Sequence, residues 1–239
     1  MADIDATGPT GPTGQAGASE ATGATGSTPR ARYRQQVRAE VKRCAREQIA
    51  TAGASGLSLN AIAKQMGMSG PALYRYFAGR DELITELVRD AYRSIADAFV
   101  AAGEKAGPAG LAEVLRRWAL EDPHRYFLVY GTPVPGYEAP EEITAIAGEM
   151  MSVLLGACAA VTAPPGSGSE AEAFEAHLAD HRAWAGAHPD AAPAALRLAL
   201  AFWSRLHGVL SLELAGHFTG MGLDPAQLYT AEVESLLAR

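Results

Sequence analysis

Residues 57–78 read LSLNAIAKQMGMSGPALYRYFA, which we interpret as two short helices joined by a tight turn. Ser58 is a favourable N-cap, because its hydroxyl can accept a hydrogen bond from a free amide of the first turn. Four apolar residues then recur at helical spacing and would cover one face over two turns. These residues are Leu59, Ile62, Ala63 and Met66. Gly67 ends this helix, since glycine adopts a left-handed backbone conformation without a Cβ penalty.

The second helix begins after Ser69, another N-cap, and tolerates Pro71 because a first-turn proline costs no helical hydrogen bond. Its inward face consists of Leu73, Tyr76 and Phe77. Its outward face consists of Gly70, Ala72, Tyr74 and Arg75. Small, aromatic and basic groups on the second helix after a glycine turn predict a DNA-binding helix-turn-helix. An ordinary helical hairpin is the alternative, but the second helix is too short to build a core.

The same residues resemble those of the TetR (TetR/AcrR) family of repressors. The resemblance rests on the spacing of Ile62-Ala63, Gly67 and Leu73-Tyr74, on Phe77-Ala78-Gly79-Arg80, and on Glu82-Leu83. It covers residues 31–102 with specific motifs, and the rest in helical layout. It implies an all-α chain, with an N-terminal three-helix helix-turn-helix head on a C-terminal helical-bundle body that binds an effector and dimerises. The expected domains are a tail at 1–29, a DNA-binding domain at 30–79 and the body at 80–239.

The formal net charge of −7 is unevenly distributed along the chain. Residues 30–93 carry twelve Lys or Arg against six Asp or Glu, whereas residues 94–239 carry eight against eighteen. A basic module on an acidic body is what local phosphate binding needs, since the whole-chain charge would repel DNA. Residues 1–29 carry three acids, no base and almost no apolar bulk, so we predict that they are disordered.

A first helix is predicted at residues 30–52, with an apolar face and a strongly basic side. A run of basic residues is usually only a solvated face. Because this run adjoins a helix-turn-helix, we predict that its first arginines contact phosphates. By the family resemblance, the residue that begins the helix joining head and body does the same. The residues predicted to contact DNA are Arg30, Arg32, Arg34, Ser58, Leu59, Ser69, Gly70, Pro71, Ala72, Tyr74, Arg75 and Arg80.

The helices of the body are separated by segments rich in proline and glycine. Asp122-Pro123 interrupts one helical pattern, and residues 131–140, GTPVPGYEAP, are unsuited to a helix. Helices are predicted at 80–102, 111–121, 124–130, 141–161, 170–186, 193–217 and 225–237, with loops at 103–110 and 162–169.

Aromatic and methionine side chains from several of these helices must converge inside the body. Such walls are typical of a pocket for a largely apolar small molecule, and TetR-like repressors place an effector cavity there. The same side chains would equally fill a close-packed core, and helical phase does not distinguish the two. The residues predicted to bind an effector are Trp118, Tyr126, Phe127, Tyr130, Met150, Leu154, Trp203 and His207.

Trp203-x-x-x-His207-Gly208, together with Tyr130-Gly131-Thr132-Pro133, is similar to the TetR subgroup whose C-terminal region is named for a Trp-His-Gly motif. The helix at 193–217 also carries a stripe of small residues that allows close approach by a second helix. We predict that this stripe and a face at 174–184 pair with their copies in a homodimer, which would bind a palindromic operator. The predicted interface residues are Phe174, His177, His181, Ala201, Ser204, Gly208, Ser211 and Ala215.

The sequence gives little support for catalysis, a cofactor or a metal. Its Glu-x-x-His, Glu121 to His124, is interrupted by proline, and there is no phosphate-binding glycine loop and no Gly-x-Ser-x-Gly motif. His177 and His181 lie four apart, but no cysteine or carboxylate on the same face would complete a metal site. We therefore predict a regulator that is not an enzyme and holds no metal or cofactor.

We also expect a cytoplasmic protein with reduced thiols and no membrane partner. The chain shows no signal peptide and no apolar run approaching eighteen residues, and Cys44 and Cys158 make no recognisable pair. The leading interpretation is a repressor that a small molecule releases from its operator. A constitutive DNA-binding regulator without an effector remains open and, more distantly, a metal-sensing regulator or a helical enzyme.

Overall fold

The computed structural model describes residues 28–134, 136–161 and 168–238, and the secondary-structure elements in these ranges are all helices. The predicted all-α fold is therefore confirmed for the described part of the chain. The tail predicted at 1–29 and the loop predicted at 162–169 lie almost entirely outside the described residues.

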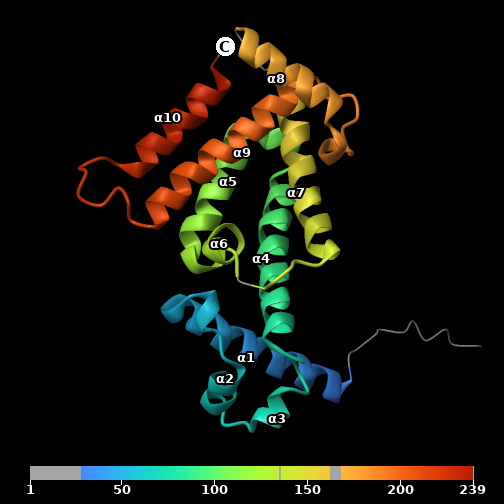
Figure 1. The fold of residues 1–239 in the computed structure, drawn as a ribbon, viewed down its shortest axis with the longest axis vertical. Coiled ribbons are helices and arrows are strands. Elements are labelled where there is room, and N and C mark those ends of the chain that lie inside the picture. The colour runs from blue at the N-terminus through green and yellow to red at the C-terminus, as the bar shows by residue number, and fades with distance from the viewer. Residues whose placement is uncertain (1–27, 135, 162–167, 239) are drawn as a thin grey trace, which may run out of the picture.

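A small head and a larger helical body lie at opposite ends of the molecule (Figure 1). The helix α4 (Arg80–Ala102) begins in the head and continues into the body. The head contains α1 (Pro29–Ala52), the 3-10 turn η1 (Ala54–Gly56), α2 (Leu59–Gln65) and α3 (Gly70–Leu73). The body contains η2 (Glu104–Ala106), α5 (Gly107–Glu121), α6 (Pro123–Tyr130), α7 (Glu141–Ala159), α8 (Ser169–Asp180), η3 (Ala183–Ala185), α9 (Pro193–Leu214) and α10 (Pro225–Leu237).

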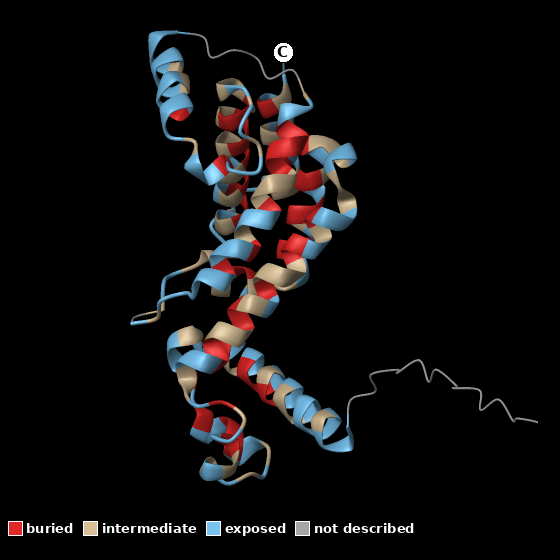
Figure 2. Cartoon of the chain, turned by 90° about the vertical axis from the view of Figure 1, so that its right-hand side faces the viewer, coloured by how far each residue is buried: buried red, intermediate tan, exposed pale blue. Residues whose placement is uncertain are grey.

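Two hydrophobic cores stabilise the head and the body, and α4 contributes to both (Figure 2). Leu83 and Leu87, near its start, are buried in the head core. Ile95 and Phe99, near its end, are buried in the body core. Tyr92 lies between these pairs and packs against both cores. Burial of apolar surface is the main stabilising term in folding, so α4 is tied firmly into each part.

Helix starts match the predictions where the sequence supplies a capping side chain. Ser58 Oγ accepts a hydrogen bond from the amide of Ala61 at 3.3 Å. Asp122 Oδ1 accepts one from the amide of Arg125 at 2.9 Å, and α6 restarts directly after it. These bonds satisfy amides that have no partner within the helix, which confirms Ser58 as an N-cap.

Asp224 Oδ1 likewise accepts a hydrogen bond from the amide of Ala226 at 2.9 Å and confirms the predicted cap of α10. Ser69 also stands at the N-cap position of α3, but its side chain makes no capping bond. Ser69 therefore occupies the predicted N-cap position, but the capping hydrogen bond expected from its side chain is not formed.

The loop predicted at 103–110 is wrong, because most of this segment is helical. The 3-10 turn η2 occupies Glu104–Ala106, and α5 begins at Gly107 rather than Leu111. Pro108 lies in the first turn of α5, where a proline needs no amide partner and its fixed φ suits the helix. Pro108 is buried, so packing in the body favours this earlier start.

The helix predicted at 170–186 is also wrong at its C-terminal end, because α8 ends at Asp180. The following segment makes hydrogen bonds that a continued helix would exclude. The Arg182 guanidinium donates to the carbonyl of Ala191 at 2.7 Å, and His188 Nε2 lies 2.8 Å from the carbonyl oxygen of Ser152 on α7. Two other helices end slightly early, α7 at Ala159 and α9 at Leu214.

The expectation of no membrane-length apolar segment needs correction at α7. Within the described residues, this helix of 19 residues has an 18-residue window of mean hydropathy 1.4, which meets the length and composition of a membrane span. Of that window, 44% is buried inside the protein, and Met150, Leu154 and Cys158 lie in the body core. Core helices meet the same criterion, so α7 is weak evidence for a membrane segment.

Candidate DNA interface and ligand-binding core

The turn between α2 and α3 fixes the geometry of the helix-turn-helix. Gly67 has a φ of 66°, which a side chain rarely adopts. The amide of Met68 donates to the carbonyl of Ala63 at 2.8 Å, and the amide of Gly67 donates to the carbonyl of Lys64 at 3.2 Å. These bonds close the end of α2 and direct the chain at once into α3.

The second helix is shorter than predicted, because α3 ends at Leu73, and Tyr76 and Phe77 lie beyond its end. Leu73 and Phe77 are nevertheless fully buried and anchor this part of the head. The Arg38 guanidinium of α1 lies over the Phe77 ring, 4.1 Å from its centroid, and donates to the carbonyl of Tyr76. Arg38 also lies 3.5 Å from a carboxylate oxygen of Glu82 on α4. The exit from α3 is therefore held by both long helices of the head.

The outward face is exposed, as contact with a DNA groove requires. Tyr74 is 48% exposed, and Ser69, Pro71 and Arg75 are exposed beside it. Gly70 and Ala72 are half-buried on the same short helix, and Ser58 is exposed at the start of α2. Leu59 differs from the other predicted contacts, because its side chain is 5% exposed and belongs to the head core. A DNA contact at Leu59 would have to use its backbone.

The basic side of α1 divides into paired and unpaired arginines. Lys42 Nζ lies 2.6 Å from a carboxylate oxygen of Asp90, and Arg43 pairs with Glu40 and Glu47. In contrast, the three arginines at the start of α1 are exposed and have no ion-pair partner in the described part of the chain. They are Arg30, Arg32 and Arg34. Unpaired guanidinium groups are the ones available to phosphates.

Arg80 begins α4 and has a role that the sequence did not indicate. Its Nη2 donates to the carbonyl of Ala54 in η1 at 3.0 Å, and its Nη1 lies 3.7 Å from Asp81. Its side chain is 32% exposed, so part of the guanidinium still faces solvent. Arg80 thus fixes the turn before α2 and retains donors for the predicted phosphate contact.

An aromatic cluster lies in the body where α4, α5, α6 and α9 meet. Tyr130 of α6 is at its centre, with ring centroids 4.3 Å from His207, 5.7 Å from Trp203 and 6.3 Å from Trp118. Tyr126 stacks on His207 at 5.6 Å. The aromatic residues predicted for an effector site therefore converge, with Phe127 at 5.4 Å from Tyr126.

Tyr92 of α4 joins this cluster and was not among the predicted site residues. Its ring lies edge-on to Tyr130, with centroids 6.0 Å apart. It was missed because Tyr92 stands beside the apolar stripe of α4 rather than within it. Its position one residue after the buried Ala91 was the available signal.

Two polar atoms of the cluster have no hydrogen-bond partner in the described part of the chain. They are the hydroxyl of Tyr130 and Nε2 of His207. Both atoms are buried, and burial raises the pKa of Tyr130 and lowers that of His207 to about 4. Buried polar atoms normally have a hydrogen-bond partner. These two atoms could therefore form hydrogen bonds with a ligand that lies against the surrounding apolar side chains.

The apolar residues predicted for the effector site, Met150 and Leu154, are buried in the same core, at 2% and 0% exposure. An opening of about 220 Å³ reaches Trp118, on the edge of the cluster, and is also lined by Arg125. The rings around Tyr130 otherwise lie in direct contact. The cluster in this conformation is therefore a packed core with an opening at one side.

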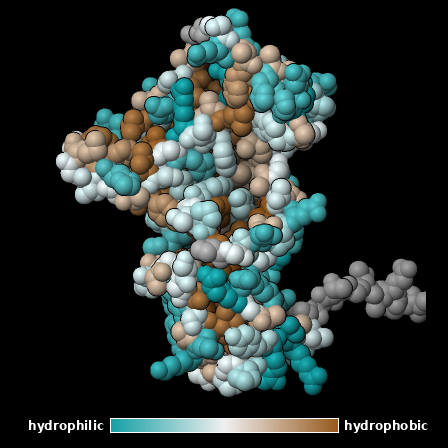
Figure 3. Space-filling view, viewed as in Figure 1, coloured by the Kyte–Doolittle hydropathy of each residue, from teal (hydrophilic) through white to brown (hydrophobic). Residues whose placement is uncertain are grey.

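The residues predicted for a dimer interface lie mostly on the surface. Ser204, Gly208 and Ala215 on or just after α9 are exposed, and Ala201 is half-buried. Ser211 is half-buried, and its hydroxyl lies 2.8 Å from that of Tyr126, so it also serves the aromatic cluster. Hydrophobic side chains are visible on the surface of the upper body, the region of α8, α9 and α10 (Figure 3).

On α8, Phe174 is 44% exposed. The exposed ring of His177, also on α8, stacks on that of His181, the C-cap residue, with centroids 4.1 Å apart. Trp184 lies in η3 rather than on α8, so the predicted continuous face from 174 to 184 is divided between two elements. Among the described residues, no group of three or more His, Cys, Asp or Glu is arranged to hold a metal.

Comparison with known proteins agrees with this arrangement. Residues 43–87 match the family model described as bacterial regulatory proteins, tetR family, and residues 108–236 match the model of the tetracyclin repressor-like C-terminal domain. The chain is 32% identical over 228 residues to the HTH-type transcriptional regulators Rv1816 of Mycobacterium tuberculosis and Mb1846 of Mycobacterium bovis. The alignment covers 86% of this chain and 92% of each relative.

Two solved structures share the fold. The crystal structure described as that of regulatory protein SCO4313 is 65% identical, with a TM-score of 0.80, and covers 89% of this chain and 100% of that chain. A protein of unknown function from Rhodococcus sp. RHA1 is 22% identical, with a TM-score of 0.60 over 85% of this chain and 96% of its own, and supports the fold alone. Helix-turn-helix head, helical body and relatives together place this chain in the TetR family of transcriptional regulators, a family that is not enzymatic.

Proposed function

We propose that this TetR-family member is a cytoplasmic, homodimeric repressor that binds a palindromic operator and is released by a small, largely apolar effector. The observation that carries the effector is the pair of unsatisfied atoms, Tyr130 Oη and His207 Nε2, inside an aromatic cluster. A ligand with an apolar body and one polar group would satisfy them while it contacts the surrounding rings.

The exposed outer face of the second helix supports the operator-binding part of the proposal. Tyr74 and Arg75 are free to reach base edges in the major groove, while Arg30, Arg32 and Arg34 are free to contact phosphates. Base contacts would determine the preferred sequence, and phosphate contacts would set most of the salt dependence.

Open space along α9 supports the homodimer. A Cβ at Gly208 would meet no atom within 4 Å, so this position leaves room for a helix from a second copy. Four helices packed around a two-fold axis would place two recognition helices about 34–36 Å apart, which matches successive major grooves.

Coupling between effector and operator would use Tyr92, because this α4 residue contacts Tyr130 in the cluster and also packs against the head core. A ligand that inserts between the rings around Tyr130 would displace Tyr92 and with it α4. A tenfold to hundredfold loss of operator affinity requires about 1.4 to 2.7 kcal/mol of differential binding.

The experiment begins with genome-wide mapping of binding sites, which supplies an operator for fluorescence anisotropy. A thermal-shift screen then finds compounds that stabilise the protein, because a ligand that binds the folded state raises its melting temperature. We expect at least one stabilising compound to release the labelled operator.

The Tyr130→Phe variant should bind that compound more weakly and should bind the operator with unchanged affinity. Tyr33→Phe, which alters a 63% exposed tyrosine of the head, is the matched control and should bind the compound like wild type. If the stabilising compounds leave operator binding unchanged, the constitutive regulator becomes the better function.

A further inference from the structure

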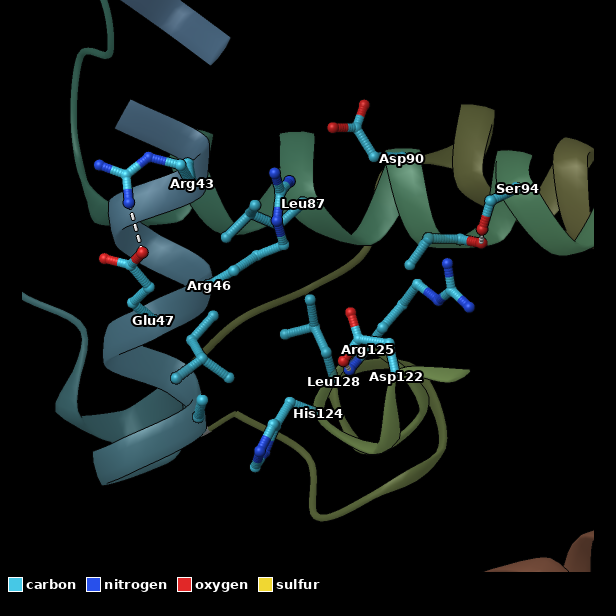
Figure 4. A pocket seen from close by; sticks show the side chains of 13 residues that line it. Arg43, Arg46, Glu47, Leu87, Asp90, Ser94, Asp122, His124, Arg125 and Leu128 are labelled. Carbon is cyan, nitrogen blue, oxygen red and sulfur yellow. Dashed lines mark hydrogen bonds and ion pairs between the residues drawn. The ribbon is translucent and has the colours of Figure 1, made fainter. Parts of the chain in front are cut away.

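An opening of about 430 Å³ lies between the head and the body. It meets the aromatic cluster only at its edge, where its lining residue Ser94 accepts a hydrogen bond from Trp118 Nε1 at 2.8 Å. Its walls come from α1 of the head, α6 of the body and α4, which belongs to both (Figure 4). This volume is within the usual range of about 300–1,000 Å³ for small-molecule sites.

The floor of the opening is apolar. Ile49 of α1, Leu87 of α4 and Leu128 of α6 line it, and Ile49 and Leu87 are 7% and 2% exposed. Ala50, also in the lining, is exposed on α1 and faces the opening without filling it. A hydrocarbon or aromatic ring of modest size would find contact on three sides.

The acidic residues around this floor are already engaged. Glu47 pairs with Arg43 and also accepts a hydrogen bond from Gln65 at 3.0 Å. Asp90 lies 2.6 Å from Lys42 Nζ, and Asp122 accepts the amide of Arg125 as the cap of α6. Because each of these carboxylates already has a partner within the protein, the opening does not favour a cationic ligand.

The basic residues around the same floor are not fully engaged. Arg46 and His124 have no hydrogen-bond or ion-pair partner among the described residues. Arg125 donates from Nη2 to the carbonyl of Trp118 at 2.7 Å and pairs with Glu121 at 3.1 Å, and only its Nε is buried without a partner in the described part of the chain. Figure 4 shows Arg46 extending from α1 toward Leu87, across the apolar floor. Unsatisfied donors above an apolar surface favour an anion with an apolar body.

We propose that this opening binds a small amphipathic organic acid, with its carboxylate toward Arg46 and its apolar body on Ile49, Leu87 and Leu128. The ligand would bridge the head, through Arg46, and the body, through the α6 residues His124 and Leu128. This site adjoins the opening beside Trp118, with which it shares Ser94 and Arg125, but Arg46, Ile49 and Leu87 lie outside the proposed effector core. Its test does not depend on DNA binding.

The test measures binding of 1-naphthoate to the full chain by isothermal titration calorimetry, with the uncharged 1-naphthamide as the matched ligand. We expect 1-naphthoate to bind and 1-naphthamide to bind about tenfold or more weakly, because a hydrogen bond to a charged group contributes about 1.5–3 kcal/mol. Equal binding of the two ligands would overturn the assigned ligand class.

Two variants test the location, and both alter exposed residues so that the fold is retained. Arg46→Gln removes the unpaired charge, and Ala50→Phe fills the opening from its rim. Each should weaken 1-naphthoate about tenfold, while the controls Arg34→Gln and Ala39→Phe, at exposed α1 positions outside the lining, should bind like wild type. Wild-type binding by Arg46→Gln and Ala50→Phe would overturn the site. Loss of binding in Tyr130→Phe alone would move the ligand to the aromatic core and leave the proposed function intact.

Discussion

Tyr126 of α6 stacks on His207 of α9, with ring centroids 5.6 Å apart and the phenol oxygen 3.0 Å from Nδ1 of the imidazole. This contact occupies one ring nitrogen and leaves Nε2 buried among Trp203 and Tyr130. The body therefore holds a histidine that the fold keeps neutral.

The first prediction concerns acid stability. Burial lowers the pKa of His207 from 6.5 to about 4, so between these values the unfolded chain binds a proton that the folded chain does not. The free energy of unfolding should fall as pH drops from about 6.5 to 4, by about 3 kcal/mol from this residue. Urea unfolding at several pH values measures it. The advantage of wild type over His207→Asn should shrink across this range. Parallel curves for wild type and His207→Asn would contradict the burial argument.

The second prediction concerns the anchor of the recognition helix. Phe77→Ala should destabilise the head by about 3–5 kcal/mol, because it leaves a cavity at a fully buried position and removes the ring beneath Arg38. Tyr33→Ala, which removes an exposed ring on α1, should cost far less. Chemical denaturation followed by circular dichroism gives both values. Equal losses for the two variants would argue against Phe77 as the anchor.

The third prediction concerns Arg80. Replacing it with Ala should weaken binding to all DNA sequences similarly and reduce the salt slope by about one unit, as expected for one lost phosphate contact. Arg80→Lys keeps the positive charge and should retain most of the salt dependence of binding. It loses the guanidinium group that donates to the carbonyl of Ala54. Anisotropy titrations over a range of salt concentrations measure the slope, with exposed Arg117 of α5 replaced by Ala as the control. An unchanged slope in Arg80→Ala would leave it a purely structural role.

The fourth prediction concerns base recognition. Tyr74→Ala should change which operators are preferred rather than weaken every sequence equally, because Tyr74 is exposed on the outer face and makes no contribution to the head core. Selection from a randomised operator library reads out the preference. Recovery of the wild-type preference by the variant would place the base contacts elsewhere.

The fifth prediction concerns assembly. Gly208→Leu should leave the folded protomer intact, because a Cβ there meets nothing within 4 Å, yet it should overpack the seam between two copies. Gly148→Leu is the matched control, since Gly148 is also exposed, helical and open. Sedimentation at low concentration should give a monomer for Gly208→Leu and a dimer for Gly148→Leu. A dimer in both would place the interface elsewhere.

The sequence predicted the head well because its helix ends are encoded locally. Ser58 supplies the cap and Gly67 supplies the left-handed turn, and each acts through neighbours within five residues. Leu73 and Phe77 were predicted to face inward, and both are fully buried, although Phe77 lies after the end of α3. These features need no knowledge of the rest of the chain.

Features that depend on distant contacts were missed. The end of α8 is set by the hydrogen bond of Arg182 to Ala191 and by His188 reaching Ser152 of α7, 36 residues away in sequence. The pairing of the basic side chains of α1 depends in part on acids of α4, since Arg38 lies 3.4 Å from Glu86 and Lys42 lies 2.6 Å from Asp90. The opening between α1 and α6 likewise requires the placement of the head against the body.

The continuity of α4 has a mechanical consequence. A helix of 23 residues is about 35 Å long at 1.5 Å per residue, and both of its ends are embedded in a hydrophobic core. If its body end is held and the helix tilts by about 5°, its head end moves by about 3 Å, close to the 3.4 Å rise of one base pair. A small tilt of α4 within the body would therefore displace the helix-turn-helix by about the spacing of one base pair.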